Sequence, residues 1–454
     1  MKKRVKIGLC LALSFVFLFV TACGNADVKN ETRGEAKDGD VTLRFFTLNV
    51  DRTQGEGLVE QKLLDDYMAE NPHVTIEIEA LENEAYKQKF KAYVAGGDLA
   101  DIFYTWSYGA FFNPLIEGGY VEALNEEDYV DYTFSESAVD ALRGADGTLY
   151  GLPRSFDSYV VYYNTRIFEE NNIEVPETFE ELIEIAEKLR ANGIMPASIN
   201  GGEKWSLQVL LQNIYFQYTR DNVVINEMIQ NGTPKFVNAE DFRYVSEQFV
   251  KLNEVGFFQD SYLADDYAAM QNLFQQEQVA MMYMGNWLNS MHFDPAIPEE
   301  VRENISAFAL PPLEGAKGTN RDNVAMVGGA YALNANSDKV EEARKLLNYM
   351  MRPEGWCKTA WELSGIFSAQ DMTPFVSQEQ RQGLQGVMLE YMNTIEGMTG
   401  QPFVEVGSPA FKTDGQDAIQ EMAGGMITVE QFLERMDSAT ARSVEAVKAG
   451  EVND

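Results

Sequence analysis

The sequence predicts an α/β fold, in which helices cover the faces of a layered sheet. The segment VTIEIEA at 74–80 alternates apolar and polar residues without a break, which is typical of a strand with one buried and one solvated face. Helical patterns lie on both sides of it, and further strand patterns follow at short spacing. Strands and helices that alternate in this way indicate a layered α/β sheet.

The first part of the chain supplies this alternation. The segment VTLRFFTL is β-branched and aromatic, and the next helix places Val59, Leu63 and Tyr67 on one face before Asn71–Pro72 stops it. Gly96–Gly97 ends the second helix. The predicted elements are strand 41–48, helix 57–70, strand 74–80, helix 85–95 and strand 100–104.

The rest of the chain continues as a mixture of strands and helices. Capping boxes at Thr178–Glu181 and Thr428–Gln431 open two helices, the first of which Gly193 closes, and residues 205–291 are mainly helical. Residues 308–312 read as a segment that crosses between parts of the fold. The other predicted elements are strand 158–163, helices 242–253 and 267–275, strand 279–283, strand 325–333 and helix 339–351.

The amino terminus predicts export. Four cations precede an apolar run at 7–20 that is shorter than the roughly 20 residues a membrane-spanning helix needs, so a signal peptide at 1–22 fits better. The residues from Val20 to Cys23 resemble a bacterial lipobox, whose cysteine receives a diacylglyceryl group; the alternative is an ordinary signal with an incidental cysteine. We expect a lipoprotein anchored through Cys23 on the extracytoplasmic face of the membrane, because two acyl chains hold a protein stably there. The polar segment at 23–40 would be its flexible tether.

Charge and cysteine content narrow the choice of partners. The net charge of −35 repels nucleic acid and anionic lipid, so we expect no nucleic-acid partner. The cysteines are Cys10 in the signal, Cys23 and Cys357. With Cys23 lipidated no internal disulfide can form, and burial alone must hold the fold.

Signatures of catalysis are sparse. His73 and His292 are the only histidines, which argues against a multi-histidine metal site or a His-centred triad, and no phosphate-binding glycine loop is present. Among 71 acidic residues some must be neighbours, so Asp265–Asp266 does not by itself identify a glycosidase pair. We expect no catalytic residue, no metal and no cofactor.

Aromatic residues beside predicted strands suggest a sugar cleft. Trp106 and Trp287 come just after strands, and Phe156 lies beside the strand at 158–163. Ligands of open α/β sheets bind outside the carboxyl ends of strands, where an indole can stack on a pyranose ring while carboxylates and amides bind its hydroxyls. Any single tryptophan could instead pack in the core.

The chain also resembles the family-1 extracellular solute-binding proteins, the carbohydrate-capturing subunits of bacterial ABC importers. The resemblance covers nearly all of the mature chain, and the order and spacing of its pieces carry it. These pieces are GDLADIF at 97–103, YGLP at 150–153, YYN at 162–164 with Phe168, PETFEEL at 176–182, Phe274 with VAMM at 279–282, GNW at 285–287, Gly328–Gly329, Asn336–Ser337 and RPE at 352–354.

The resemblance implies a two-lobe periplasmic-binding-protein fold, type II-like, with the ligand in a cleft that hinge crossings close. We expect residues 41–153 plus 313–352 in the amino-terminal lobe and 154–312 plus 353–454 in the other. Residues 152–157 would form the first hinge crossing.

The resemblance also implies which residues face the ligand. Trp287 falls where the family commonly places a sugar-stacking aromatic, and Asp157 where maltodextrin-binding relatives have a ligand-bonding carboxylate; Trp205 is either ligand-facing or core. Ser107–Gly109 and Gly365–Ser368 depart from the common family pattern, which puts the pocket contour at the first of them in doubt. The predicted ligand-binding residues are Trp287, Trp106, Asp157, Phe156, Asn49, Asp51, Glu84 and Trp205.

The function that follows is that of a monomeric, lipid-anchored receptor that captures an oligosaccharide and delivers it to the permease subunits of an ABC transporter. Two alternatives remain at this point. One is a secreted glycoside hydrolase, and the other is a sugar receptor that feeds a membrane sensor.

Overall fold

The computed structural model describes residues 39–107, 109–233 and 235–449. The chain divides into two units, Met1–Asp40 and Val41–Asp454, and the architecture below is that of the second. The predicted signal peptide, Cys23 and the tether up to residue 38 lie outside the described residues. Within the described part, no helix combines the length and apolar character needed to cross a bilayer.

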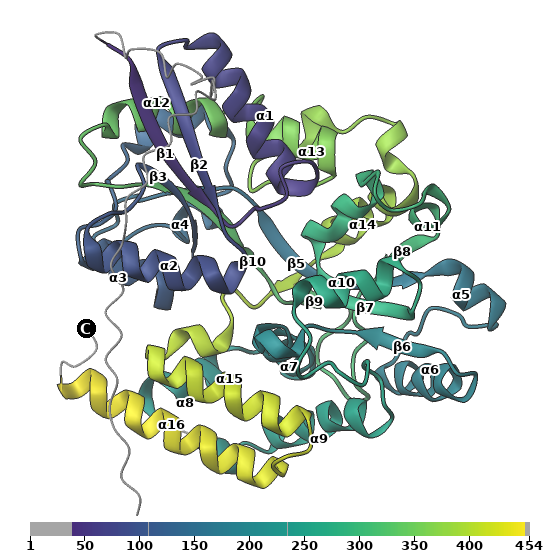
Figure 1. Ribbon diagram of the computed structural model, residues 1–454. Helices are drawn as coiled ribbons and strands as arrows, with labels where there is room; N and C mark the ends of the chain where they lie inside the picture. Colours follow the sequence, from purple (N-terminus) through teal and green to yellow (C-terminus); the bar gives the residue numbers. More distant parts are fainter. Residues whose placement is uncertain (1–38, 108, 234, 450–454) are drawn as a thin grey trace, which may run out of the picture. The chain divides into compact units, whose positions relative to one another are not determined.

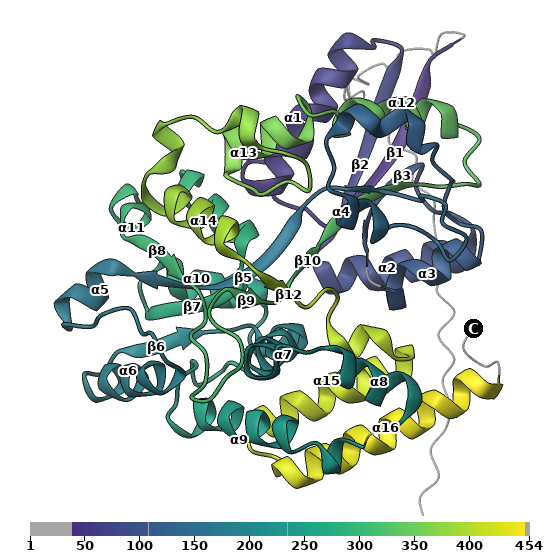
Figure 2. The ribbon, with the colours of Figure 1, turned by 180° about the vertical axis from the view of Figure 1, so that it is seen from behind.

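The first sheet has the strand order β2-β1-β3-β11-β4. Figures 1 and 2 show three of its strands, β1, β2 and β3, beside one another. β1 pairs in parallel with β2 and β3, whereas β11 pairs antiparallel with both β3 and β4. The predicted strand at 74–80 is confirmed with the same bounds. The strands are β1 (Val41–Thr47), β2 (Val74–Ala80), β3 (Ile102–Trp106), β4 (Leu152–Pro153) and β11 (Gly329–Leu333).

The helices of this part bury the faces that the sequence predicted. In α1, Val59, Leu63 and Tyr67 are buried, and in α2 Tyr86 and Phe90 join the same core. Trp356 of α13 packs edge-on against Tyr331 of β11. The helices are α1 (Gly55–Glu70), α2 (Asn83–Gly96), α3 (Gly109–Glu117), α4 (Glu136–Asp140), α12 (Val340–Met351) and α13 (Trp356–Ser364), with the 3-10 helix η1 (Glu126–Tyr132).

The second sheet has the order β10-β5-β7-β6, and β8 also pairs with β5. Its central strand, β5, is longer than the predicted 158–163. The short pair β9 and β12 lies apart from both sheets. These strands are β5 (Phe156–Asn164), β6 (Met195–Ser198), β7 (Val279–Gly285), β8 (Ile305–Phe308), β9 (Asp322–Asn323), β10 (Ala325–Val327) and β12 (Gly397–Met398).

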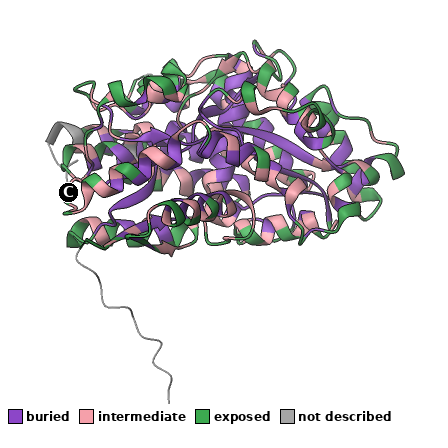
Figure 3. Ribbon diagram, turned by 90° about the horizontal axis from the view of Figure 1, so that it is seen from above, coloured by how far each residue is buried: buried purple, intermediate pink, exposed green. Residues whose placement is uncertain are grey.

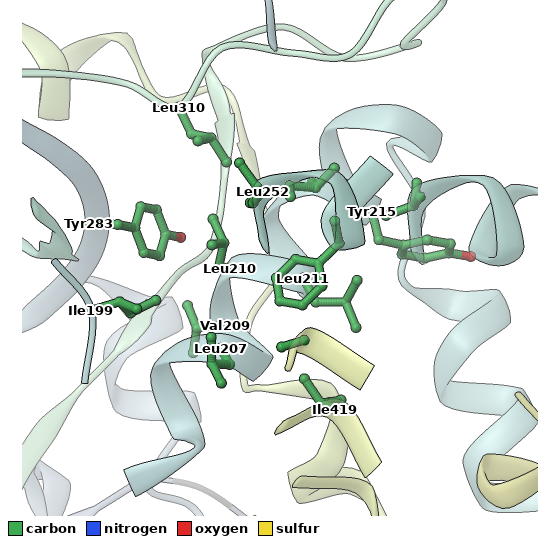
Figure 4. Close-up of a cluster of buried hydrophobic side chains, with 14 of the residues drawn as sticks. Ile199, Leu207, Val209, Leu210, Leu211, Tyr215, Leu252, Tyr283, Leu310 and Ile419 are labelled. Atoms are coloured by element: carbon green, nitrogen blue, oxygen red, sulfur yellow. The ribbon is translucent and has the colours of Figure 1, made fainter. Parts of the chain in front are cut away.

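Helices bury the second sheet in two cores. α7 is buried on nearly all sides, and its leucines contact Ile419 of α15, Leu252 of α9 and Tyr283 of β7 (Figure 4). Figure 3 shows the buried positions gathered in the strands and the exposed ones on the outer faces of the helices. The helices are α5 (Thr165–Glu170), α6 (Phe179–Ala191), α7 (Trp205–Thr219), α8 (Val223–Asn231), α9 (Glu240–Glu254), α10 (Tyr267–Gln275), α11 (Glu299–Glu303), α14 (Gly383–Thr394), α15 (Pro409–Ala423) and α16 (Val429–Ala449). The 3-10 helices are η2 (Gly201–Glu203), η3 (Phe236–Asn238), η4 (Asn286–Phe293), η5 (Thr373–Phe375), η6 (Glu379–Arg381) and η7 (Phe403–Val406).

Both predicted capping boxes are confirmed. The Thr178 hydroxyl accepts from the Glu181 N–H at 3.2 Å, and the Glu181 carboxylate accepts from the Thr178 N–H at 3.3 Å. Thr428 and Gln431 make the same reciprocal pair at the start of α16, at 3.2 and 2.9 Å. Each box satisfies two backbone donors that a helix start would otherwise leave without partners.

Three connections run between the two sheets. Arg154 and Ser155 join β4 to β5, Gly328 joins β10 to β11, and a third segment passes at Phe367. The Gly328 N–H donates to the Ser155 carbonyl at 3.2 Å, and the Phe156 N–H donates to the Phe367 carbonyl at 3.3 Å. The three connections are therefore hydrogen-bonded side by side.

The predicted crossing at 308–312 is wrong. β8 belongs to the second sheet, Leu310 and Leu313 are buried in the core of that sheet, and the Gln217 side chain donates to the Leu310 carbonyl at 2.8 Å. Because Pro311 and Pro312 ended the apolar segment, it looked like an exit from one lobe, but the chain returns to the first sheet only after β10. The lobe boundaries as a set stay a prediction.

Candidate ligand-binding site

Two tryptophans and two tyrosines from four elements form an aromatic cluster. Trp205 begins α7 and Trp287 follows β7, and their ring centroids lie 6.3 Å apart with an interplanar angle of 47°. The Trp287 indole N–H donates to the Tyr267 hydroxyl at 2.8 Å, and Tyr159 of β5 meets the Trp287 ring edge-on at 5.5 Å. Both tryptophan residues are half-buried.

Gly285 makes room for Trp287. The indole folds back over the end of β7, and a Cβ on Gly285 would lie 2.0 Å from its ring. No real Cβ tolerates that distance, so only glycine permits this placement of the ring. The sequence Gly285-Asn286-Trp287 is therefore a local unit that sets the orientation of the Trp287 indole.

Glu203 fixes the second indole and was not predicted from the sequence. Its carboxylate accepts from the Trp205 indole N–H at 2.7 Å and from the Asn200 amide at 3.0 Å. The Tyr267 backbone N–H lies 3.4 Å from its other oxygen. A signal was present, because Glu203 stands two residues before Trp205 in the glycine-led turn that the resemblance pointed to.

A buried ion pair holds the β4–β5 connection against α1. The Arg154 guanidinium donates to Glu56 at 2.7 Å, and the two side chains are only 3% and 16% exposed. The guanidinium also lies over the rings of Tyr104 and Trp356, at 4.8 and 5.0 Å from their centroids. Sequence reasoning missed this pair, because its members are far apart along the chain.

Asp157 is held beside this ion pair. Burial raises the pKa of Asp157 to about 7, and the Glu56 carboxylate adds to the rise, while Ser155 and Arg154 oppose it. A Cβ on Gly328 would lie 1.6 Å from an Asp157 carboxylate oxygen, so the β10–β11 connection packs directly on the carboxyl group. Asp157 is thus a poorly solvated carboxyl group, and a hydrogen-bond donor from a ligand would stabilise its ionised form.

Carboxylates from both sheets lie close enough to the aromatic cluster to affect pKa values there. Burial raises the pKa of Tyr267, and the carboxylates of Glu56, Glu203 and Glu82 raise it further. Burial also raises the pKa of Glu82, with contributions from Glu203 and Asp266. Since Glu56 and Glu82 belong to the first-sheet part and the others to the second, the two parts face each other here.

Trp106 lies in a separate group of rings. It meets Tyr104 edge-on at 5.0 Å and Phe111 at 4.9 Å, and the Lys87 ammonium group lies 5.2 Å from its ring centroid. Trp106 is half-buried at the end of β3. Tyr104 connects this group to Arg154.

Three predicted polar residues make local contacts outside the aromatic cluster. The Asn49 amide donates to the buried Glu60 at 2.7 Å. Asp51 is exposed and accepts from residues 53 and 54, and hydrogen bonds from Thr53 lower its pKa despite some burial. Glu84 is exposed and pairs with Lys87 at 2.7 Å.

Phe156 faces away from the aromatic cluster. Successive strand residues point to opposite faces, so Asp157 and Tyr159 share one face of β5 and Phe156 takes the other. We expected Phe156 and Asp157 to face the cleft together, and the structure does not bring them together. Phe156 instead lines a pocket of about 530 Å³ with Thr133, Ser135, Ser137, Ser368, Ala369, Gln370 and Asp371.

A family model described as bacterial extracellular solute-binding protein matches residues 52–355. The chain belongs to this family. The match spans β4, the connection to β5 and the Gly285–Trp287 unit, so the site described above lies within it. The predicted family and the α/β two-lobe fold are confirmed.

Relatives in this solute-binding family include transport proteins. The multiple sugar-binding protein of Streptococcus mutans is 23% identical over 354 residues, which are 77% of this chain and 79% of that one. An uncharacterized ABC transporter extracellular-binding protein of Pyrococcus horikoshii is 21% identical over 264 residues, 56% of this chain and 57% of the relative.

Solved structures share the fold. One from work on xylan utilization by Caldanaerobius polysaccharolyticus has a TM-score of 0.78 at 24% identity and covers 88% of this chain and 99% of its own. A chitin oligosaccharide binding protein has a TM-score of 0.77 at 21% identity, with coverage of 90% and 100%. RafE in complex with raffinose has a TM-score of 0.71 at 19% identity, with coverage of 89% and 100%.

Proposed function

We propose that this solute-binding protein is a carbohydrate receptor that delivers an oligosaccharide to an ABC transporter permease, and that it acts by binding and not by catalysis. The observation that carries the proposal is the pair of half-buried indoles whose edges are hydrogen-bonded to Tyr267 and Glu203. The sugar-binding relative and the oligosaccharide complexes among similar folds support it.

The arrangement suits a pyranose chemically. The apolar C–H face of a sugar ring stacks on an indole, while its hydroxyls donate to carboxylates at the rim. Glu203 and Asp157 are carboxylates in position to accept such bonds. At micromolar affinity the net binding free energy is about −8 kcal/mol, which a few stacked faces and rim hydrogen bonds supply after the cost of closure.

Of the predicted ligand-binding residues, we propose Trp287, Trp205 and Asp157 as ligand contacts. Trp106, Asn49, Asp51, Glu84 and Phe156 stay predictions, since their contacts are with neighbours outside the aromatic cluster.

The test is calorimetric titration with neutral mono-, di- and oligosaccharides, after a thermal-shift screen, because a ligand that binds only the folded state raises its stability. We expect one saturable site and a rise in melting temperature with at least one oligosaccharide. Heat from a peptide or polyamine and from no sugar contradicts the proposal. Release of reducing sugar from a bound glycan contradicts the non-catalytic part of it.

We also propose that the receptor is a monomer anchored at the outer face of the membrane through a lipidated Cys23. The extracellular character of the family supports the location. Replacing Cys23 by Ser should release the protein from the membrane fraction into the medium or periplasm while leaving sugar affinity unchanged. Full membrane retention of C23S contradicts the lipid anchor.

A further inference from the structure

The ionisable groups at the aromatic cluster carry an excess of negative charge. Glu82 lies between β2 and α2, Asp157 on β5, Glu203 in η2, and Asp266 caps α10 by accepting from the Ala269 N–H at 2.9 Å. We call Glu82, Asp157, Glu203 and Asp266 the carboxylate set. Within the described ranges, none of the four forms an ion pair with a lysine, arginine or histidine.

Two lysines that adjoin predicted ligand-binding tryptophans are already paired. Lys204, next to Trp205, binds Asp417 with its ammonium group 2.5 Å from the carboxylate. Lys87 binds Glu84 at 2.7 Å.

The Arg154 guanidinium pairs with Glu56 through one nitrogen and lies over the rings of Tyr104 and Trp356. Its other two nitrogens have no hydrogen-bond partner within the described part of the chain, but they are buried and so lie out of reach of a ligand in the cleft. Each of these three cations thus already has a carboxylate partner, so among the described residues named here a negatively charged ligand would meet the carboxylate set before it met an unpaired cation.

We infer that the site admits uncharged oligosaccharides and discriminates against those that carry uronate groups. The inference rests on the proposed carbohydrate-binding function. A sugar hydroxyl can donate to a carboxylate, whereas the carboxylate of a uronic acid only accepts. Two like charges in a partly dehydrated site also repel strongly, and such repulsion is a common source of specificity.

Asp157 and Glu203 are the members most firmly placed. Glu203 accepts from Trp205 and Asn200, so it cannot swing away from an incoming anion without losing both bonds. Asp157 is confined by Gly328, and because burial raises its pKa to about 7 it is fully charged only above that pH, so the exclusion should strengthen as the pH rises through 7. Two members of the carboxylate set are therefore held in place, whereas the other two, Glu82 and Asp266, are exposed.

The experiment compares matched neutral and acidic sugars by calorimetry on the mature protein. Cellotriose, raffinose and stachyose are each paired with the form in which a C6 primary alcohol is oxidised to a carboxylate. We expect each acidic form to bind about tenfold or more weakly than its neutral parent. Raising the salt from about 0.05 to about 0.5 M should narrow the gap, since salt screens repulsion.

Two variants remove single charges from the carboxylate set. Glu203→Gln keeps an acceptor for Trp205, and Glu82→Gln changes an exposed side chain, so it leaves the fold intact. Both variants should reduce the difference in affinity between each neutral sugar and its acidic form. Glu187→Gln removes an equal charge from the exposed face of α6 and should leave the gap unchanged.

An acidic form that binds as tightly as its neutral parent overturns the inference and leaves the proposed function standing. The inference is also overturned if Glu187→Gln reduces the affinity difference as much as Glu203→Gln and Glu82→Gln do. The net charge of the protein, and not the carboxylate set, would then cause the discrimination. No heat from any of the six sugars counts against the proposed function itself, and the inference falls with it.

Discussion

Single residues decide how the aromatic cluster is built. Trp205 and Trp287 could be recognised from the sequence because indoles beside strand ends and glycine-rich turns are visible in it. Glu56 and Arg154 could not, because they pair with each other across 98 residues of sequence. Glu203 was missed although it stands two residues before its partner Trp205. With 71 acidic residues in the chain, the role of one carboxylate can be assigned only when its hydrogen-bond donors are known.

Trp287→Ala should weaken sugar binding at least tenfold, or by about 1.4 kcal/mol in binding free energy, because a stacking face is lost. Trp287→Phe, which keeps an apolar ring, should lose less. Calorimetry on both variants measures the effect, and circular dichroism checks the fold. Equal affinity in the alanine variant and the parent would assign Trp287 to packing alone.

Asp157 should make stability depend on pH. Its pKa is 3.8 when unperturbed and about 7 in the fold, so between these values the folded chain holds a proton that the unfolded chain has released. The resulting stabilisation is fully present below about pH 4 and is lost as the pH rises through 7. Asp157→Asn cannot titrate, so this variant should gain stability relative to the parent between pH 5 and pH 8.

Urea unfolding of both proteins at each pH measures this difference. Other groups titrate in both and cancel in the comparison. A difference in unfolding free energy that stays flat across the range would show that Asp157 does not hold a proton in the folded protein.

At the scale of elements, the local patterns predicted more than the connections did. The strand at 74–80 and the helix starts at Thr178 and Thr428 follow from alternation and capping, which are local properties. The crossing at 308–312 was misplaced, because two prolines can end an apolar segment without leading the chain out of its lobe. The sheet to which each strand belongs is fixed by pairing between segments far apart along the chain, and such pairing cannot be read from the sequence.

Replacing Gly328 by Ala should destabilise the fold by about 1–3 kcal/mol, since the added methyl would overlap the Asp157 carboxylate. In an Asp157→Ala background the same change should cost much less, because the overlapping atoms are gone. Gly96→Ala, where a Cβ would meet nothing within 4 Å, is the matched control. Urea unfolding of the four members of the cycle gives the coupling, and an equal cost in both backgrounds would contradict it.

At the scale of the whole molecule, burial and not covalent linkage holds the described fold together. Cys357 is a buried free thiol, and burial raises its pKa to about 12. We expected no internal disulfide because we assigned Cys23 to a lipid anchor, whereas the core of the first sheet and the two cores of the second became visible only in the structure.

The melting temperature should therefore be the same with and without a reducing agent. Cys357 should resist alkylation in the folded protein and react on unfolding, because a buried neutral thiol is a poor nucleophile. Differential scanning calorimetry and mass-spectrometric alkylation measure the two effects. A lower melting temperature in dithiothreitol would reveal a cross-link.

The place of β11 in the first sheet bears on how the protein matures. β11 lies between β3 and β4, although nearly 180 residues separate it from β4 along the chain. The amino-terminal strands therefore cannot complete their sheet until most of the polypeptide has been made, and pairing over such distances is slow. If the chain is exported, as we propose, this delay keeps its leading part unfolded until the trailing part has been made.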